Sequence, residues 1–200
     1  LYPGHSVHRM HCHPKRTGKA LIDSLVTAVD KAGIDIMTSA TVTDIFASES
    51  SEIRGIRILR PDGSTEDIGC ESLILACNGF GGNPGMVSKY IPEMAGAMYF
   101  GHQGNLGDAV NWGLELGAAV KNMAAYQGHG SVAIPHGALI TWAIMMEGGI
   151  QLNSNGIRFS NEHEGYSEQS IKVLQQPGGT AWNIYDERLH QLGLEFDDYR

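Results

Sequence analysis

The sequence predicts a chain of two parts, a partial α/β domain over residues 1–92 and a mixed α+β domain over residues 93–200. Three observations predict this division. Helical and extended patterns alternate in the first part, an apolar run over residues 73–76 ends in a glycine-rich turn, and from about Pro84 onward glycine-rich segments replace the alternation. With 42% apolar residues, the 200-residue chain can bury a substantial core.

The composition excludes several classes of protein. A formal net charge of −8 argues against a nucleic-acid partner, which would require a basic face to neutralise phosphates. No apolar run is long enough to span a bilayer, so we expect no integral membrane segment. Cys12, Cys70 and Cys77 have no repeated spacing, so we expect neither a disulfide framework nor a zinc site, and the cytoplasm is the expected compartment.

The first part is predicted to begin with a helix. Apolar residues recur at helical spacing over residues 20–32, which predicts about four turns, and Gly33 follows where a C-terminal cap would lie. Short apolar segments then predict strands over residues 34–37 and 42–46.

A hairpin and a buried strand are predicted next. Residues 53–59 alternate isoleucine with polar residues or glycine, residues 61–63 form a Pro-Asp-Gly turn, and residues 65–68 return. The apolar run over residues 73–76 predicts a strand covered on both faces. Together these elements form half of a nucleotide-binding fold, in which ligands collect beyond the carboxyl ends of the strands.

The turn after this last strand is the most informative feature of the chain. Its glycines permit positive φ and allow a ligand to approach the backbone without a Cβ in the way. The run over residues 76–82 resembles the Ala-Thr-Gly-Gly-Phe strand end of the FAD-dependent fumarate reductase/succinate dehydrogenase flavoprotein family, although Cys77-Asn78 replaces the usual first residues of that run. An ordinary strand-to-helix connection is the alternative. The resemblance implies FAD contacts by Ala76, Cys77, Asn78, Gly79 and Gly81.

A helix is predicted to begin near Asp108, because apolar residues recur over residues 110–120 and an acid is favourable in a first helical turn. Residues 104–108 resemble the family's Thr-Gly-Asp-Gly loop, which implies that Asp108 faces the cofactor. The alternative is that Asp108 is only an N-terminal cap.

Residues 127–131 resemble the family's Gln-x-His-Pro-Thr segment, and Thr141 follows at the family's spacing for a further substrate contact. The resemblance implies that His129, Ser131 and Thr141 bind substrate, with His129 and Thr141 donating hydrogen bonds to a carboxylate or carbonyl. A histidine bonded only to loop backbone is the alternative.

Residues 150–162 predict a hairpin around an Asn-Gly turn and resemble the family pattern Val-Asn-x-x-Gly-x-Arg-Phe-x-Asn-Glu. We expect a structural polar network there, formed by Arg158, Asn161 and Glu162, rather than catalysis. Residues 175–186 resemble the family's return strand and its acidic end.

Two positions depart from fumarate reductases. Trp142 replaces an acid, and Tyr166 stands where those enzymes have a proton-donating arginine. A tyrosine there is similar to flavin-dependent 3-ketosteroid dehydrogenases, which implies that Tyr166 transfers a proton while the flavin handles a hydride. The alternative is a tyrosine packed on a loop with its hydroxyl in solvent.

A cluster of possible metal ligands lies near the amino terminus. Its members are His5, His8, His11, Cys12 and His13. No carboxylate or second cysteine completes a tetrahedral set nearby, so we expect no metal site. The resemblance instead places this loop near the flavin, which implies that Arg9 binds a substrate carboxylate; a solvated basic loop is the alternative.

No G-x-G-x-x-G motif is present, so a dinucleotide pyrophosphate has no recognisable cradle here. The family has that motif upstream, so we expect an internal fragment that binds FAD weakly or not at all in isolation.

The resemblance implies an oxidoreductase that interconverts CH–CH and C=C beside a carboxylate or carbonyl. Tricarballylate-type and 3-ketosteroid-type dehydrogenases both remain open, as does an inactive packing domain for the isolated chain. The implied partners are a small carboxylate or enone substrate and the rest of a parent flavoprotein, and the electron partner stays unknown.

Overall fold

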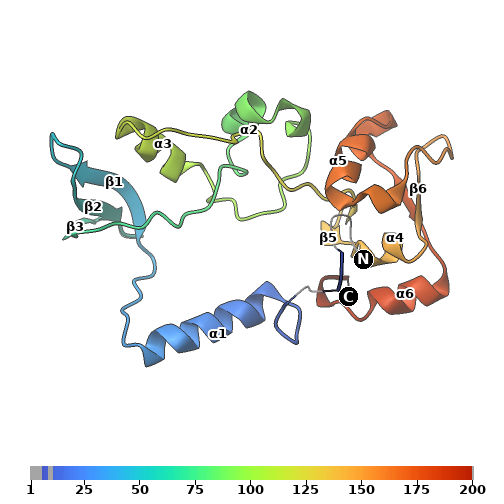
Figure 1. Cartoon of the computed structure of the whole chain (residues 1–200), viewed down its shortest axis with the longest axis horizontal. Helices are drawn as coiled ribbons and strands as arrows, with labels where there is room; N and C mark the ends of the chain where they lie inside the picture. Colours follow the sequence, from blue (N-terminus) through green and yellow to red (C-terminus); the bar gives the residue numbers. More distant parts are fainter. Residues whose placement is uncertain (1–5, 9–10, 200) are drawn as a thin grey trace. The chain divides into compact units, whose positions relative to one another are not determined.

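The computed structural model describes residues 6–8 and 11–199 and divides the chain into two compact units. The first unit contains residues 1–28 and 126–200, and the second contains residues 29–125 (Figure 1). Both helices and small antiparallel sheets occur, so the predicted mixed α/β and α+β architecture is confirmed. In the described part of the chain, every helix is too short or too polar to span a bilayer.

Helix α1 (Gly18–Lys31) confirms the first predicted element. The Thr17 hydroxyl accepts a hydrogen bond from the Ala20 N–H (3.2 Å) and so satisfies one donor of the first turn. At the other end, Gly33 has φ of +66°, the left-handed conformation that favours glycine after a helix.

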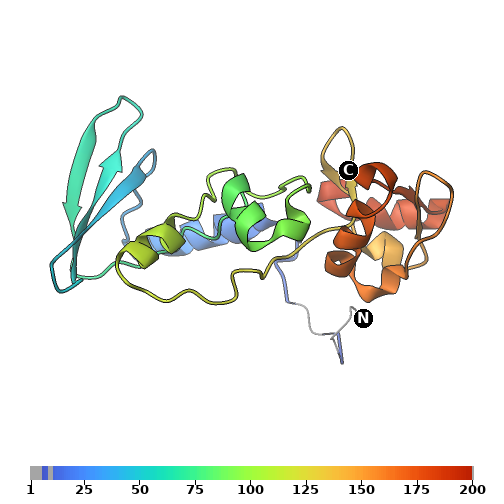
Figure 2. The same ribbon diagram turned by 90° about the horizontal axis from the view of Figure 1, so that it is seen from above.

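The second unit contains an antiparallel sheet in the order β1-β2-β3, whose strands lie side by side in Figure 2. Its strands are β1 (Thr41–Ala47), β2 (Ile53–Leu59) and β3 (Thr65–Gly69). Leu59 pairs with Thr65 across the predicted turn, which confirms the hairpin. Gly55 is required in β2, because a Cβ there would lie 2.4 Å from the Ile68 carbonyl oxygen.

The strands predicted over residues 34–37 and 73–76 are wrong. Neither segment is a strand, and within the described residues the three-stranded sheet has no further member. Ile36 is 54% exposed and Ile74 is 88% exposed. An apolar run predicts burial, but a strand also requires backbone partners on a neighbouring strand, and here neither segment has them.

Three short helices complete the second unit: α2 (Pro84–Tyr90), η1 (Pro92–Met94) and α3 (Asp108–Glu115). The Asn83 side chain caps α2 by accepting from the Met86 N–H (3.1 Å). Helix α3 begins at Asp108 as predicted, but it ends at Glu115 instead of continuing to Val120. Gly117 then adopts φ of +82°, which turns the chain out of the helix.

The first unit is built from short elements around one core. In chain order they are β4 (Val132–Ala133), β5 (Ala138–Leu139), α4 (Ala143–Met146), β6 (Ile150–Leu152), η2 (Glu162–Glu164), α5 (Tyr166–Leu174), η3 (Pro177–Gly179), β7 (Trp182–Ile184), α6 (Glu187–Gly193) and η4 (Asp197–Tyr199). The core consists of Trp142, Ile144, Met145 and Leu189. Strands β4 and β5 pair with each other, as do β6 and β7.

The region of residues 150–162 differs in part from its prediction. Strand β6 pairs with β7, which confirms the predicted return strand, whereas only one bridge, Leu152 to Arg158, closes the expected hairpin. The Asn153 side chain holds the turn by accepting from the Ile157 N–H (3.1 Å), and Gly156 has φ of +73°. A polar turn that is satisfied by its own asparagine does not require two full strand arms.

Candidate active site

The loop that carries His129 lies against the start of helix α5. The Gly128 N–H donates to the Ser167 hydroxyl (2.9 Å), and the Gly130 N–H donates to the Tyr166 carbonyl (3.0 Å). A Cβ on Gly128 would lie 2.1 Å from the Ser170 Oγ, so only glycine permits this approach. His129 is therefore fixed in position relative to Tyr166 by backbone contacts on either side of it.

Residues predicted as substrate clamp and proton-transfer group form one cluster. The His129 and Tyr166 rings stack with centroids 5.4 Å apart and an interplanar angle of 23°. Trp142 packs edge-on against His129 at 5.9 Å, and the Gln127 side-chain amide donates to the Tyr166 hydroxyl (2.8 Å). We call these residues the aromatic cluster: Gln127, His129, Trp142 and Tyr166.

His129 is a neutral hydrogen-bond donor at neutral pH. Burial lowers the pKa of its imidazole by more than the backbone at Ser131 raises it. Because Nδ1 accepts from that N–H (3.2 Å), the proton of the neutral ring lies on Nε2. Nε2–H is thus the group that His129 presents to a ligand.

Thr141 and Ser131 occupy different environments. Thr141 is half-buried, directly precedes Trp142, and its hydroxyl accepts a long hydrogen bond from the Ala143 N–H (3.4 Å). Ser131 is only 4% exposed, and its hydroxyl accepts from the Asn183 amide. Thr141 therefore adjoins the aromatic cluster only through its chain neighbour Trp142, whereas the Ser131 hydroxyl is already bonded inside the unit.

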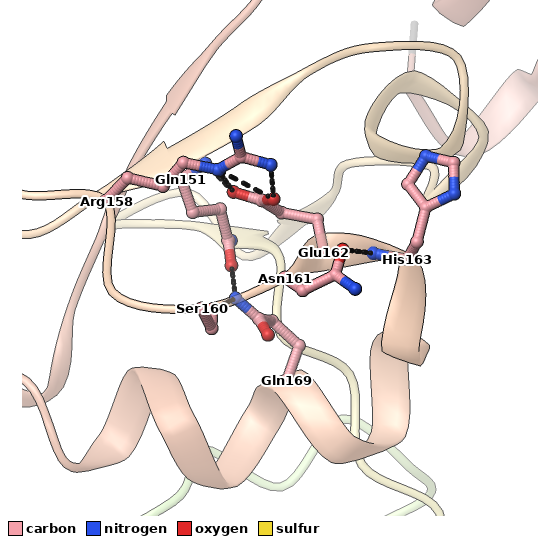
Figure 3. Close-up of polar contacts among 7 residues, drawn as sticks. All are labelled: Gln151, Arg158, Ser160, Asn161, Glu162, His163 and Gln169. Atoms are coloured by element: carbon pink, nitrogen blue, oxygen red, sulfur yellow. Dashed lines mark hydrogen bonds and ion pairs between the residues drawn. The ribbon is translucent and has the colours of Figure 1, made fainter.

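The expected contact between Arg158 and Glu162 is present, whereas Asn161 bonds to the His163 backbone instead of joining it (Figure 3). The Arg158 guanidinium contacts both carboxylate oxygens of Glu162, the shortest contact being 2.6 Å from Nη2 to Oε2. The Glu162 side chain is 1% exposed and also accepts from the Gln151 N–H (2.7 Å). Burial disfavours its charge, but these hydrogen bonds outweigh burial and lower the pKa of the Glu162 carboxyl. Asn161 caps η2 by accepting from the His163 N–H (3.1 Å).

Gln151 connects this network to the His129 loop, a role that sequence reasoning missed. Its side-chain amide donates to the Gly130 carbonyl and to Asn183, both at 2.8 Å, and its oxygen accepts from the buried Gln169, toward which it points in Figure 3. The sequence held one signal for this role, a glutamine between the apolar residues Ile150 and Leu152. The alternation in this segment predicts a packed strand, and it does not indicate which buried polar groups the glutamine bonds to.

The loop after residue 79 contacts the segment before Asp108 in the second unit. The Gly82 N–H donates to the Asn105 carbonyl (2.9 Å), and the Asn83 amide donates to the Leu106 carbonyl (3.0 Å). Gly107, with φ of +89°, contacts Phe80 so closely that a Cβ would lie 2.9 Å from the Phe80 Cβ. Gly107 is also the N-cap residue of α3, so Asp108 is the first helical residue and not the cap.

This loop fits a flat cofactor on its open side. Ala76, Cys77 and Asn78 are exposed, and a Cβ on Gly79 would meet no atom within 4 Å. Asn78 adopts φ of +63°, and its side chain accepts from the Gly79 N–H (2.9 Å), which holds a sharp turn. Gly81 differs, because its Cβ would lie 2.2 Å from the Tyr99 ring. Exposed backbone, an open glycine and a nearby acid suit the edge of a flavin nucleotide better than a compact ligand.

Two predicted features cannot be placed. Arg9 and His5 lie outside the described residues. Within the ranges that the structure covers, no three His, Cys, Asp or Glu side chains converge on a common point.

The chain matches the family model described as FAD binding domain over residues 2–185, and it belongs to this family. The predicted resemblance to FAD-dependent flavoproteins is therefore confirmed, and FAD is the cofactor of the family. The chain is 30% identical to NADH:fumarate oxidoreductase of Klebsiella pneumoniae (strain 342), over 94% of this chain and 20% of that protein. It is 29% identical to 3-oxosteroid 1-dehydrogenase of Mycobacterium tuberculosis (strain ATCC 25618 / H37Rv), over 86% of this chain and 33% of that protein.

A solved structure gives the same result. The open conformation of a flavocytochrome c3 fumarate reductase is similar with a TM-score of 0.77 and 28% identity, and the match covers 92% of this chain and 32% of that chain. The chain therefore spans about a fifth to a third of the length of these relatives.

Proposed function

We propose that the chain is the part of a larger FAD-dependent oxidoreductase that binds the substrate and exchanges its proton. The reaction interconverts CH–CH and C=C next to a carbonyl or carboxylate. The observation that carries this proposal is the aromatic cluster, in which a neutral histidine donor stacks on a tyrosine whose hydroxyl is held by an amide. Fumarate reductase and steroid dehydrogenase relatives support the same class of chemistry.

FAD, when bound, supplies the hydride acceptor or donor for this reaction. The residues that would hold it are the exposed Ala76, Cys77 and Asn78, the open Gly79, and Asp108 at the start of α3. Gly81 contributes indirectly, because it allows Tyr99 to pack under the loop. The first part of the parent flavin domain is proposed to end near residue 92, where the substrate domain begins.

The substrate contacts are assigned to His129 and Thr141, with Ser131 supporting the loop. His129 Nε2–H donates to the carbonyl or carboxylate oxygen and stabilises the charge that develops there. The Tyr166 hydroxyl gives its proton to the adjacent carbon in the reducing direction, and in the oxidising direction the deprotonated Tyr166 oxygen takes the proton from that carbon. Arg9 is proposed to pair with a substrate carboxylate where one is present.

A second candidate is a 3-ketosteroid-type dehydrogenase. Trp142, 2% exposed, replaces the acid of fumarate reductases, and Arg158 is engaged by Glu162. A neutral His129 suits a ketone oxygen, since a carboxylate gains more from a cationic partner. We place the enzyme in the cytoplasm, supported by its three cysteines, none of which is in a disulfide.

The test uses the full-length flavoprotein that contains this chain, screened with fumarate-like acids and with cyclic enones or ketones against an artificial electron acceptor. His129→Ala should lower kcat/KM by about 30- to 1000-fold, the scale for losing one preorganised donor, while flavin content stays normal. His163→Ala, an exposed histidine in η2, is the matched control. Unchanged kcat/KM in His129→Ala would remove the clamp from the mechanism.

Tyr166→Phe separates the proton-transfer role from packing. The phenyl ring keeps the stack on His129, so substrate binding should survive, whereas turnover should fall by about a hundredfold or more because the hydroxyl is gone. Tyr90→Phe, in α2 of the second unit, removes a hydroxyl elsewhere and should leave turnover unchanged. Ordinary turnover in Tyr166→Phe would assign the proton to another group.

The isolated chain is proposed to bind FAD weakly or not at all, since it has no phosphate cradle. Its visible absorption spectrum after gel filtration tests this, because bound flavin is yellow. Stoichiometric flavin on the isolated chain would overturn the proposal.

A further inference from the structure

The chain contains two Asn-Gly pairs, and the glycine N–H of each pair has a different partner. At Asn78-Gly79, the Gly79 N–H donates to the side-chain oxygen of Asn78 itself, at 2.9 Å. At Asn155-Gly156, the Gly156 N–H donates to the backbone carbonyl of Asn153, also at 2.9 Å. Both asparagines of the pairs are exposed, so burial does not distinguish them. The two pairs differ in which oxygen receives the glycine N–H.

The contact at Asn78 brings two reactive atoms together. Because the side-chain oxygen is bonded to Cγ, the N–O distance of 2.9 Å and a C=O bond of about 1.2 Å place the Gly79 nitrogen no more than about 4 Å from the Asn78 Cγ. A separation of about 3 to 3.5 Å defines a conformation ready for attack, so only a small motion remains. A backbone nitrogen that attacks this carbon closes a five-membered succinimide ring.

The fold holds this geometry and leaves it open to solvent. Asn78 adopts φ of +63°, a left-handed conformation that asparagine tolerates better than most residues, and its contact with the Gly79 N–H holds the turn. Gly79 has no side chain to shield its nitrogen, and a Cβ built there would meet no atom of the described residues within 4 Å. The contact that stabilises the turn is therefore the same contact that prepares the attack.

We propose that Asn78 is a site of spontaneous covalent modification, at which the chain converts its own asparagine to aspartate and isoaspartate. The Gly79 nitrogen loses its proton and bonds to the Asn78 Cγ, the Cγ–Nδ2 bond breaks, and Nδ2 leaves as ammonia with that proton. Water then adds to either carbonyl carbon of the ring and breaks its bond to nitrogen. Opening at Cγ gives aspartate, and opening at the backbone carbon gives isoaspartate. Water is consumed and ammonia is released, and nothing is oxidised or reduced.

The modification changes the loop toward FAD, a step that rests on the proposed flavin contacts of residues 76–79. Both products replace a neutral amide by a carboxylate, and isoaspartate also adds a methylene to the backbone of the turn. FAD carries a negatively charged pyrophosphate, so the new charge disfavours its binding. Bound FAD in turn covers the loop and slows the attack. The flavoprotein without its cofactor thus converts to a form that binds the cofactor less well.

The test follows both Asn-Gly pairs in one sample of the full-length flavoprotein, freed of FAD and incubated at mildly alkaline pH in water enriched in ¹⁸O. Proteolysis and mass spectrometry report the conversion of each asparagine, and labelling by isoaspartyl methyltransferase identifies isoaspartate. We expect Asn78 to gain ¹⁸O at least about tenfold faster than Asn155, because only Asn78 holds the glycine nitrogen at its own side chain.

Synthetic peptides that contain each pair give the rates without the fold, and they should be similar to each other. Equal rates for the two pairs in the folded protein, or slower conversion of Asn78 in the protein than in its peptide, would overturn the proposal.

Gly79→Ala tests whether the Gly79 nitrogen is the attacking group. The added Cβ meets no neighbouring atom, so the loop should keep its fold, but it crowds the nitrogen and should slow the conversion of Asn78 by about tenfold or more. Gly96→Ala, whose Cβ also meets no atom within 4 Å, is the matched control and should leave the rate unchanged. Unchanged conversion of Asn78 in Gly79→Ala would refute the succinimide route.

The link to FAD is measured separately. Flavoprotein loaded with FAD should convert Asn78 at least about tenfold more slowly than the protein freed of FAD, while conversion of Asn155 stays the same. Asn78→Asp, which carries the aspartate product, should bind FAD more weakly in a titration of flavin fluorescence. Equal conversion of Asn78 with and without FAD would overturn its flavin contact and leave the modification site. Absence of conversion at Asn78, with activity lost in Tyr166→Phe, would overturn the modification site and leave the proposed function.

Discussion

Replacing Glu162 by glutamine should destabilise the first unit by about 2 kcal/mol. Breaking a buried ion pair from one side costs about 3 to 5 kcal/mol, because the partner charge is left uncompensated. Here the Arg158 side chain is 52% exposed, so water recovers part of that loss and we expect about 2 kcal/mol, below that range. The glutamine keeps one oxygen that can accept from the Gln151 N–H. Its NH₂ group faces the Arg158 guanidinium, and because both groups only donate hydrogen bonds, no hydrogen bond forms between them.

The measurement is urea denaturation followed by circular dichroism, with Glu164→Gln as the matched control. Glu164 is an exposed neighbour that pairs with Lys172 at the surface, so its replacement should change the free energy of unfolding by less than about 0.5 kcal/mol. Equal losses in the two variants would refute the argument that burial makes the Glu162 pair important.

The pH dependence of stability gives an independent check. Because the folded-state pKa of Glu162 is lowered, its ion pair stabilises the fold fully above the unfolded-state pKa of about 4.3. That contribution is lost as the pH falls through the lower folded-state value. The difference in unfolding free energy between wild type and Glu162→Gln should therefore shrink below about pH 4. A constant difference from pH 7 to pH 3 would mean that the charge of Glu162 is not what stabilises the unit.

Three further predictions follow from the same unit. Gly128→Ala should lower the free energy of unfolding by about 1 to 3 kcal/mol in denaturant titrations, because the added Cβ would overlap Ser170. The control Gly96→Ala, whose Cβ would meet no atom within 4 Å, should leave the free energy of unfolding unchanged. Equal effects of the two variants would argue against a tightly packed loop at Gly128. Gln151→Leu should cost about 2 kcal/mol or more by the same assay and slow turnover, since it leaves buried partners unsatisfied; wild-type stability would show that the network is dispensable. Because burial lowers the folded-state pKa of His129, protonation of its ring favours unfolding. The contribution of His129 to the free energy of unfolding should therefore be constant above about pH 6.5 and decline below it, measured as the difference between wild type and His129→Ala. A decline of that difference already above pH 7 would contradict a neutral ring.

Local signals in the sequence were sufficient for several elements. The periodicity of residues 20–32 and the glycine after them correspond to α1, and the Pro-Asp-Gly turn corresponds to the β2-β3 hairpin. In both cases the information lies within a few residues, because helix caps and tight turns are satisfied by their own neighbours. The start of α3 at Asp108 was likewise readable, whereas its early end at Glu115 was set by the conformation of Gly117.

Strands predicted from apolar composition alone were wrong where the strand required a neighbouring strand to pair with. Residues 34–37 and 73–76 are apolar enough for buried strands, but nothing in a short apolar run specifies which backbone will pair with it. The predicted hairpin of residues 150–162 formed only in part, because β6 pairs along its length with β7, some thirty residues later, and makes a single bridge to its own neighbour.

The sequence by itself determined the family, and it nominated the residues that we propose for the site. His129, Thr141 and Tyr166 stand at motif positions, and Asp108 and the glycine-rich loop could be matched without coordinates. Only the tertiary structure decided which side chains contact one another. The Gln127 amide reaches Tyr166 across 39 positions, and Gln151 reaches the His129 loop across 21. The physical reason is that a side-chain amide can bond to many partners, and the packing of the whole unit selects which of them lies within reach.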